Sequence, residues 1–341
     1  MLLTAARLRA AALVTTRRRP TRRKLHALPG ASDYHIPVLG NECVEWLQRD
    51  DGIFVDCTLG GGGHSSLLLE KVGPNAKVIG LDRDANAIAA ATSRIQDPRF
   101  STIEAVFDEG LQRAYDEHGP FAGVLMDLGI SSRQIDDAER GFSTRFEGPL
   151  DMRMGSSGKT ALDVLNALDA RGLARLLRAN ADEPHAGRIS KAVLEALPTL
   201  VTTKDLAAVV SAAVPTSSPP ALDAKRRNKA AARVFQALRI EVNDELGALD
   251  RALALLPHLV EEKGRVVVLA YHSLEDRRVK RFFRDGKMRG DAARDAYGNR
   301  LTPFSPLTRK AQSAGDEEVE ANPRARSARL RVAERTDWSP A

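Results

Sequence analysis

The chain has 341 residues, of which 43% are hydrophobic and 28% charged, and its formal net charge at pH 7 is +6. This length and apolar fraction are typical of an α/β protein with one large domain and a smaller inserted or appended domain. The two cysteines, Cys43 and Cys57, are too few for a disulfide framework or a zinc site of their own. No apolar run approaches the roughly twenty residues of a membrane-spanning helix, which argues against membrane insertion.

The positive charge is concentrated at the start of the chain. Residues 1–32 hold eight of the 51 Lys and Arg and none of the 45 Asp and Glu, which leaves 43 basic and 45 acidic side chains in the remainder. An acid-free segment rich in Arg, Ala and Leu is typical of an organelle transit peptide. We therefore expect residues 1–32 to direct the protein to the mitochondrion, with the plastid as the alternative. The other interpretation is a basic arm that binds nucleic acid.

A glycine-rich stretch follows the first strand-like segment. The apolar run 53–56 leads into four consecutive glycines, Gly60 to Gly63, and then into a helical pattern. Glycine allows positive φ and lets a ligand lie against bare backbone, while the next helix N-terminus offers unpaired N–H groups. A second apolar run ends at Asp82, about twenty residues after the glycines, the spacing at which a carboxylate meets ribose hydroxyls. The pattern predicts a nucleotide-like cofactor site; the alternative is a flexible turn with Asp82 as a helix N-cap.

The identity of the cofactor depends on two positions around the glycines. A nicotinamide-binding fingerprint requires a third glycine or alanine where this chain has Ser65, and an acid, Asp56, precedes the loop. A carboxylate at the end of the first strand can bind the ammonium group of an amino acid, which S-adenosylmethionine carries and NAD does not. The sequence therefore favours a methyltransferase, with an oxidoreductase as the lesser alternative.

Two further strands are expected before the middle of the chain. Residues 99–107 form the third, and its end presents Phe107, which can stack on adenine or can simply join the core. Residues 121–127 form the fourth, which ends at Asp127 and runs into a polar loop. Because ligands of open parallel sheets lie at the carboxyl ends of the strands, we expect Asp127 to face the reacting group.

The second half of the chain contains a helical insertion. Residues 136–158 have the character of an ordered loop, and 160–214 show three or four short helical patterns. Thr160 is expected to cap one of these helices, and Thr202-x-x-Asp205 to form a capping box at another.

The last third of the chain returns to the alternation of helices and strands seen in the first third. The apolar spacing predicts one long helix from Phe235 to Leu256 that packs on the sheet, and then a fifth strand over 265–271. Ser273 to Asp276 should cap the next helix, and the polar segment 286–323 should be weakly ordered. Residues 322–335 then predict a last strand. Three basic patches could contact RNA: 225–229, 277–284 and 324–331.

Several motifs occur together and in order. They are His35-x-Pro37-Val38-Leu39, Asp56 to Ser65, Leu81 to Asp84, Asp127 to Ser132, Asp136 to Ser143, Gly148 to Met154, Phe235 to Ile240, His272 to Arg277 and Asn322 to Arg335. With this set the chain resembles the RsmH/MraW family of small-subunit rRNA cytidine N4-methyltransferases. The resemblance covers nearly everything after residue 34.

The resemblance implies a fold, a donor and an acceptor. The fold would be α/β, a Rossmann-like S-adenosylmethionine-dependent methyltransferase sheet with an inserted all-helical domain. The acceptor would be a cytidine of the decoding region, in free small-subunit rRNA or in a pre-assembled small ribosomal subunit; neither a metal nor a membrane is expected. The expected divisions are the transit peptide 1–32, the methyltransferase domain 33–147 and 233–285, the helical insertion 148–232, and a polar linker with a basic C-terminal segment, 286–341.

Position by position, the motifs and the resemblance together assign the site. The cofactor-binding residues are expected to be Asp56, Gly60, Gly62, Gly63, His64, Asp82, Phe107, Asp127 and Gln134. The substrate-side residues are expected to be Ser131, Ser132, Asp151, Arg153, His272 and Ser273. His64 and Gln134 follow from the resemblance alone.

Asp127 is also the candidate catalytic residue. The exocyclic amine of cytosine is a poor nucleophile, and a carboxylate that accepts its hydrogen bond would localise its lone pair. Asp127 could instead only hold the donor. A non-catalytic ribosome assembly factor that has kept the fold is the alternative for the whole protein.

The chain departs from the family pattern at two places. Lys229-Ala230-Ala231-Ala232-Arg233 replaces the usual His-Pro-Ala-Thr-Arg, and Asn180-Ala181-Asp182-Glu183 replaces a Tyr-Gly-Glu-Glu-like turn. Both lie in or beside the helical insertion, so they bear on RNA docking and not on donor binding.

Overall fold

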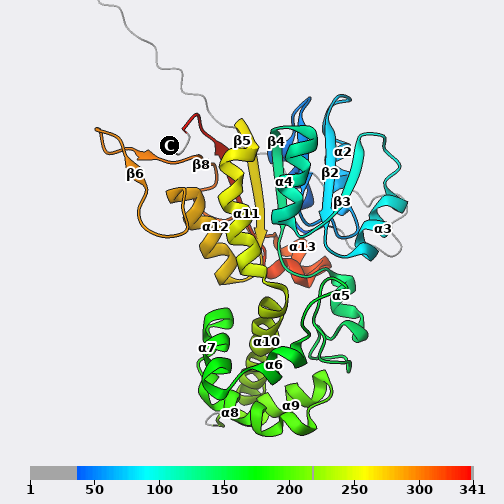
Figure 1. Ribbon diagram of the computed structural model, residues 1–341, viewed down its shortest axis with the longest axis vertical. Helices are drawn as coiled ribbons and strands as arrows, with labels where there is room; N and C mark the ends of the chain where they lie inside the picture. The colour runs from blue at the N-terminus through cyan, green and yellow to red at the C-terminus, as the bar shows by residue number, and fades with distance from the viewer. Residues whose placement is uncertain (1–36, 217–218, 339–341) are drawn as a thin grey trace, which may run out of the picture. The chain divides into compact units, whose positions relative to one another are not determined.

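The computed structural model describes residues 37–216 and 219–338 (Figure 1). The predicted leader 1–32 and His35 of the first motif lie outside these residues. A sheet of seven strands forms the centre, in the order β3-β2-β1-β4-β5-β9-β8. Its strands are β1 (Ile53–Asp56), β2 (Lys77–Asp82), β3 (Phe100–Glu104), β4 (Phe121–Asp127), β5 (Val260–Ala270), β8 (Phe304–Pro306) and β9 (Arg329–Arg335). A separate hairpin pairs β6 (Ala293–Arg294) with β7 (Arg300–Leu301).

The pairing directions make this a mostly parallel sheet with an antiparallel edge. All neighbours from β3 to β5 are parallel, whereas β9 runs antiparallel to both β5 and β8. The chain leaves β1 toward β2 and β3 and then returns to place β4 on the other side of β1. That reversal opens a crevice at the carboxyl ends of β1 and β4, the usual ligand position in such sheets. The Rossmann-like α/β prediction is confirmed.

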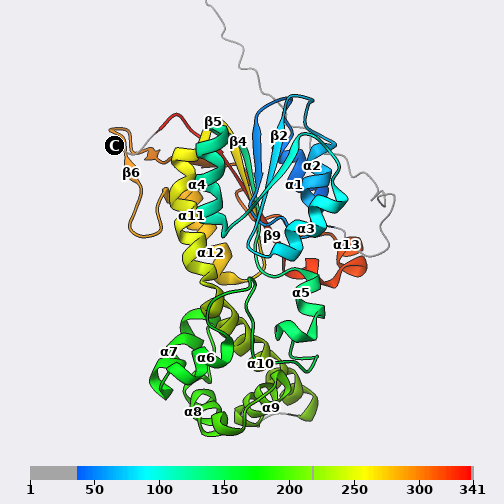
Figure 2. The same cartoon turned by 45° about the vertical axis from the view of Figure 1, so that its right-hand side comes forward.

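Helices cover both faces of the sheet, as Figure 2 shows. On one face lie α4 (Phe107–His118), α11 (Glu245–Leu259) and α12 (Ser273–Asp285), and on the other α1 (Gly40–Leu47), α2 (Gly63–Leu69) and α3 (Ala85–Arg94). Burial on both faces explains why β4 is apolar without alternation until Asp127. In the part of the chain that the structure describes, no helix is both long and apolar enough to span a membrane.

The helical insertion has a hydrophobic core of its own. It comprises α6 (Ala161–Ala167), α7 (Ala170–Ala181), α8 (Ala186–Ala196), α9 (Thr203–Ala213) and α10 (Pro220–Asn243). The predicted N-cap at Thr160 and the capping box of Thr202 with Asp205 are both present. Two short helices lie outside it, α5 (Ser132–Asp136) and α13 (Asp316–Ala321), together with 3-10 turns at 138–140 and 323–327. A further 3-10 turn at 197–199 connects α8 to α9 within the insertion.

The prediction of one long helix from Phe235 to Leu256 is wrong. The chain breaks at Asp244, whose φ of 50° is left-handed and therefore ends α10 before α11 begins. Phe235 packs in the core of the insertion, whereas Leu253 packs against the sheet. Equally spaced apolar residues serve two different cores, so the expected division between 232 and 233 falls inside α10.

The expectation that residues 286–323 are weakly ordered is also wrong. Phe304 is fully buried between Phe282 and Phe283, and Val319 packs with the core on the α1 side of the sheet. Glu318 accepts a hydrogen bond from the backbone N–H of Leu39 at 2.7 Å. A few apolar side chains are enough to order this segment, because they insert into cores that other elements form.

The burial of Phe304 predicts that this tail contributes to stability. Phe304→Ala should lower the free energy of unfolding by about 3–5 kcal/mol, because it removes a whole ring from a filled core. Tyr297→Ala is the matched control, since Tyr297 lies in the same segment but is 91% exposed, and it should change stability by less than about 0.5 kcal/mol. Urea unfolding of both variants measures the difference. Equal, small effects would mean that the tail does not fold with the sheet.

Candidate active site

The glycine loop connects β1 to α2 at the carboxyl edge of the sheet. Gly60 and Gly62 have φ of 50° and 75°, so both adopt the left-handed conformation that favours glycine. A Cβ on Gly60 would meet nothing closer than the Thr58 carbonyl oxygen at 4.0 Å, whereas one on Gly62 would approach Ile95 Cδ1 to 2.8 Å. Gly60 therefore leaves open space where a ligand can approach, and Gly62 permits close packing against α3.

Asp56 anchors this loop from the end of β1. Its carboxylate accepts hydrogen bonds from the Ser65 hydroxyl at 2.7 Å and from the Thr58 N–H at 3.2 Å, and the residue is only 1% exposed. These bonds tie the end of β1 to the first turn of α2. Asp56 thus fixes the conformation of the loop and adds a negative charge next to it. Its predicted contact with the ammonium group of a donor stays a prediction.

Asp82 connects the end of β2 to the same loop. One of its carboxylate oxygens accepts a hydrogen bond from the Gly60 N–H at 2.8 Å, and the other accepts from the Asp84 N–H at 2.9 Å. Each oxygen has a second lone pair available for a ligand hydroxyl. Asp84, and not Asp82, is the N-cap of α3, because its side chain accepts from the Asn86 N–H. This observation removes the alternative interpretation of Asp82.

Asp127 ends β4 directly across the crevice. Its backbone N–H donates to the Thr58 hydroxyl at 2.6 Å, and its carboxylate accepts from the Tyr271 hydroxyl at 2.7 Å. The second carboxylate oxygen lies 3.7 Å from His64 Nδ1, while His64 Nε2 lies 3.1 Å from the carbonyl of Val38. A carbonyl can only accept, so Nε2 carries a proton and Nδ1 faces the acid. Asp127 keeps 25% of its side chain exposed, so a ligand can reach it.

Three acids meet at the crevice, where their ionised forms repel one another. Burial raises the pKa of Asp56, of Asp82 and of Asp127, and the charge of Asp56 adds to the rise for the other two. The nearby His64 acts in the opposite direction and lowers the pKa of Asp56 and of Asp127. A bound cation would relieve this repulsion. The sulfonium and ammonium groups of S-adenosylmethionine are cations and its ribose carries hydroxyls, so the donor set fits this molecule.

Gln134 contacts the donor side through Asp84, and Phe107 follows the carboxyl end of β3. Gln134 forms a capping box with Ser131 at the start of α5 and donates to the Asp84 carboxylate at 3.2 Å. Phe107 is half-buried and is the first residue of α4, three positions beyond the end of β3, so the predicted strand over 99–107 is too long. Ser132 begins α5, next to Ser131.

The loop that carries Asp151 and Arg153 is tied to the donor side. Arg153 binds Asp151 with three hydrogen bonds, two from its guanidinium at 2.9 and 2.6 Å and one from its backbone N–H at 2.9 Å. Between them Met152 is fully buried with a left-handed φ of 60°, a conformation that costs energy in a non-glycine residue. Asn243 holds it in place, because Asn243 donates to the Met152 carbonyl at 2.7 Å and accepts from the Met154 N–H at 2.8 Å.

Arg140 completes this connection. Its guanidinium lies 3.1 Å from the Asp84 carboxylate and donates to the carbonyl oxygens of Arg153 and Met154. The donor-side acids and the substrate-side loop therefore share one arginine. Asn243 and Tyr271 were not identified as site residues from the sequence, and Arg140 was seen only as part of a motif. For Tyr271, the available signal was its place at the end of a strand beside β4.

His272 has a role in the fold, and its expected place on the substrate side stays a prediction. It is the N-cap of α12, so the predicted cap at Ser273 is wrong by one residue. Its Nε2 lies 3.1 Å from Glu275, whose side chain also accepts the Tyr271 N–H at 2.8 Å. Although burial alone would raise the pKa of Glu275, hydrogen bonds from His272 and from the Tyr271 backbone lower it. His272 thus supports the strand end at Tyr271, while Ser273 is exposed.

Both departures from the family pattern lie at the contact between α7 and α10. Glu183 is buried and pairs with Arg233 at 3.5 Å, and Gln236 donates to the Asn180 carbonyl at 3.1 Å. The substituted segments thus keep one acid and one base that pair with each other. In residues 37–216 and 219–338, no group of three or more His, Cys, Asp or Glu is arranged to hold a metal ion.

Comparison with known proteins decides the family. The model of the MraW methylase family matches residues 32–336. The chain belongs to the MraW methylase family. Ribosomal RNA small subunit methyltransferase H of Anaeromyxobacter dehalogenans is 46% identical over 312 residues, which is 88% of this chain and 97% of the relative. The protein of that name from Myxococcus xanthus is 46% identical over 322 residues, 89% of this chain and 99% of the relative.

A solved structure of an rRNA methylase from Streptococcus thermophilus also resembles this chain, with 12% identity, a TM-score of 0.36 and coverage of 87% of this chain and 94% of that one. This resemblance is too distant to carry an argument. As a member of the MraW methylase family, the protein is a methyltransferase whose methyl donor is S-adenosylmethionine.

The two hydrogen bonds at Asp82 predict the effect of its substitution. Asp82→Asn removes the charge and turns an amide N–H₂ toward a backbone N–H, so donor affinity should fall by about 1.5–3 kcal/mol while the protein stays folded. Calorimetric titration with S-adenosylmethionine measures the loss. Asp116→Asn is the control, because Asp116 is an exposed acid on α4, and it should bind the donor normally. An unchanged affinity in the Asp82 variant would contradict the placement of the donor site.

Proposed function

We propose that this methyltransferase methylates the N4 amine of a cytidine in the decoding region of small-subunit rRNA, free or in a pre-assembled small subunit. The observation that carries the proposal is the Asp127 carboxylate. It lies at the carboxyl end of β4, it is held by Tyr271, and part of it is open to a ligand beside the glycine loop. The names of the relatives from Anaeromyxobacter and Myxococcus support small-subunit rRNA as the substrate class.

The chemistry required is an in-line displacement. When bound, S-adenosylmethionine supplies an electrophilic methyl group on a sulfonium. The bond from cytosine N4 to the methyl carbon forms as the carbon–sulfur bond breaks, sulfur keeps the electron pair, and the amine then loses one proton. Asp127 can accept a hydrogen bond from the amine, which localises its lone pair, and can then take the proton. The raised pKa of this partly buried acid makes it a better proton acceptor.

Tyr271 positions Asp127 for this step. Its hydroxyl occupies one carboxylate oxygen at 2.7 Å and so directs the other toward His64 and the crevice. Positioning of this kind provides much of the rate when the nucleophile is weak. If Asp127 only holds the donor, the proton leaves to water after the transfer.

RNA docking would use the exposed cations of the three basic patches. In the patch 225–229, Lys225 and Lys229 are exposed on α10, on the insertion. In the patch 324–331, Arg324 donates to Asp136 at 2.9 Å, and Arg331 is buried against Asp276 with hydrogen bonds of 2.6 and 3.0 Å. Two arginines of this third patch thus serve the fold, whereas Arg326 and Arg329 are exposed, and RNA binding by the patch stays a prediction. Binding by the exposed cations of the three patches should weaken as salt rises.

The non-catalytic assembly factor remains the second candidate function. It would use the same docking surface but would not need an open carboxylate at the donor edge. Methyl transfer by the purified protein to small-subunit rRNA separates the two functions.

We also propose that the protein acts in the mitochondrion, with the plastid as the alternative. The support is the acid-free, arginine-rich composition of residues 1–32.

The central prediction concerns the modified nucleoside itself. Mass spectrometry of nucleosides from organellar small-subunit rRNA should detect N4-methylcytidine in cells that carry the gene and none at that position in cells without it. Restoring the gene with Asp127→Ala should not restore the modification, since donor binding or proton acceptance is lost. Unchanged N4-methylcytidine at every decoding-region cytidine after gene loss would defeat the proposal and favour the assembly factor.

The composition of the leader predicts its behaviour. Residues 1–32 fused to a fluorescent protein should carry it into mitochondria, and a version with its arginines replaced by alanine should remain in the cytosol. The purified protein without residues 1–32 should methylate rRNA as well as the full chain does. Loss of rRNA binding on truncation, with no import of the fusion, would identify the leader as an RNA-binding arm.

A further inference from the structure

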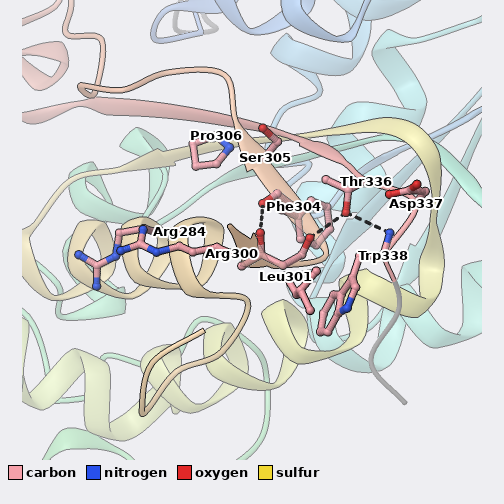
Figure 3. Close-up of a pocket in the computed structure, with 10 residues that line it drawn as sticks. Arg284, Arg300, Leu301, Phe304, Ser305, Pro306, Thr336, Asp337 and Trp338 are labelled. Carbon is pink, nitrogen blue, oxygen red and sulfur yellow. Dashed lines mark hydrogen bonds between the residues drawn. The ribbon is translucent and has the colours of Figure 1, made fainter. Parts of the chain in front are cut away.

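A pocket of about 390 Å³ lies at the edge of the sheet away from the donor crevice (Figure 3). Its lining comes from the end of α12, from β7 and β8, and from the segment after β9. Because β5 and β9 separate β8 from β4 in the sheet order, this pocket is distinct from the donor site. We propose that it binds a nucleotide of a single-stranded RNA segment, as a second contact on the substrate of the function proposed above, on which this inference rests.

One side of the pocket is cationic. Figure 3 shows Arg284 and Arg300 next to each other on this side. Asp285, only 4% exposed, accepts hydrogen bonds from Arg284 at 2.6–3.0 Å and lies 3.8 Å from Arg300. The Arg284 bond holds the pKa of Asp285 below its usual range, so this carboxylate is ionised. Two guanidinium groups sharing one buried carboxylate leave a net positive charge, and their remaining N–H donors suit a phosphate group.

The opposite side is aromatic. Trp338 lies beside Leu301, with Asp337 above it, across the pocket from the arginines (Figure 3). An indole is a platform on which a nucleobase can stack, whatever its sequence. Asp337 repels phosphate but accepts N–H groups such as those of base amines. The distribution of charge therefore orients a nucleotide, with its phosphate toward the arginines and its base on the tryptophan.

The pocket is built before a ligand arrives. The Thr336 hydroxyl donates to the Thr302 carbonyl at 2.7 Å, and the Trp338 carbonyl accepts from Arg335 at 2.6 Å. Below them, Phe304 is fully buried. These contacts fix the aromatic side to the strand that carries Leu301. A pocket volume of 390 Å³ lies within the range of about 300–1,000 Å³ typical of small-molecule sites, so one nucleotide fits.

The first test observes Trp338 directly. The full chain labelled with 5-fluorotryptophan has two signals, one for each of its two tryptophans, and Trp46→Phe assigns them. A single-stranded uridine hexanucleotide should shift the Trp338 signal and leave that of Trp46 unchanged, and the shift should disappear in Arg300→Ala. Equal shifts of both signals, or none, would overturn the proposal.

The second test measures methyl transfer to small-subunit rRNA. Trp338→Ala should raise the KM for rRNA about tenfold, because one base loses its stacking partner. It should leave kcat and the affinity for S-adenosylmethionine unchanged. Trp338→Phe should raise the KM for rRNA less, since a phenyl ring still stacks. Arg113→Ala removes an exposed arginine on α4 and should leave the KM for rRNA unchanged. A higher KM for assembled subunits alone would indicate a ribosomal protein and overturn the RNA assignment.

The two proposals can fail separately. If the wild-type protein makes no N4-methylcytidine but its Trp338 signal still responds to the hexanucleotide, the proposed function fails and the pocket stands. If the wild-type protein is active and Trp338→Ala has an unchanged KM and no response to RNA, the pocket proposal fails and the function stands.

Discussion

Two carboxylates, the buried Asp56 and the partly buried Asp82, hold the glycine loop in the conformation that a donor needs. Asp82 accepts the Gly60 N–H, and Asp56 accepts the Ser65 hydroxyl, so the ends of β1 and β2 and the start of α2 are joined through side chains of one charge type. This arrangement is unfavourable without a ligand, because burial penalises the ionised form of each acid. The donor crevice is thus prepared for a cation at some expense of stability, as expected where strain and charge serve binding.

Asp84, two residues after Asp82, connects the donor side to the substrate side. Asp84 shares Arg140 with the carbonyl oxygens of the loop that carries Arg153, and Asn243 holds that loop from the last residue of α10. Arg83 donates to the Asn243 carbonyl at 2.9 Å, so the residue after Asp82 reaches the same point. Because α10 ends there at the left-handed Asp244, the helical insertion meets the sheet domain where these contacts converge. A change at the donor acids therefore has a direct physical route to the insertion.

The arginines in and near the C-terminal segment have two different roles, which its composition alone does not separate. Arg331 and Arg335 are buried and bind Asp276 and backbone carbonyls, which makes them part of the fold. Exposed arginines nearby, such as Arg284 and Arg300, keep donors available at the surface. Burial, and not the number of positive charges, decides which arginines can meet RNA: Arg284 and Arg300 share the Asp285 carboxylate but stay exposed, whereas Arg331 and Arg335 are enclosed by the protein.

Features that depend on neighbours in the chain were determined by the sequence alone. The alternation of strands and helices, the positive φ at the glycines, the caps at Thr160 and Thr202 and the acids ending β2 and β4 all follow from local spacing. The tertiary structure decided which distant groups meet. Tyr271 reaches Asp127 across 144 positions because β5 pairs with β4, and Phe304 finds its core only beside α12. Local spacing carries no information on such pairings, because they depend on the order of strands and on which faces are already filled.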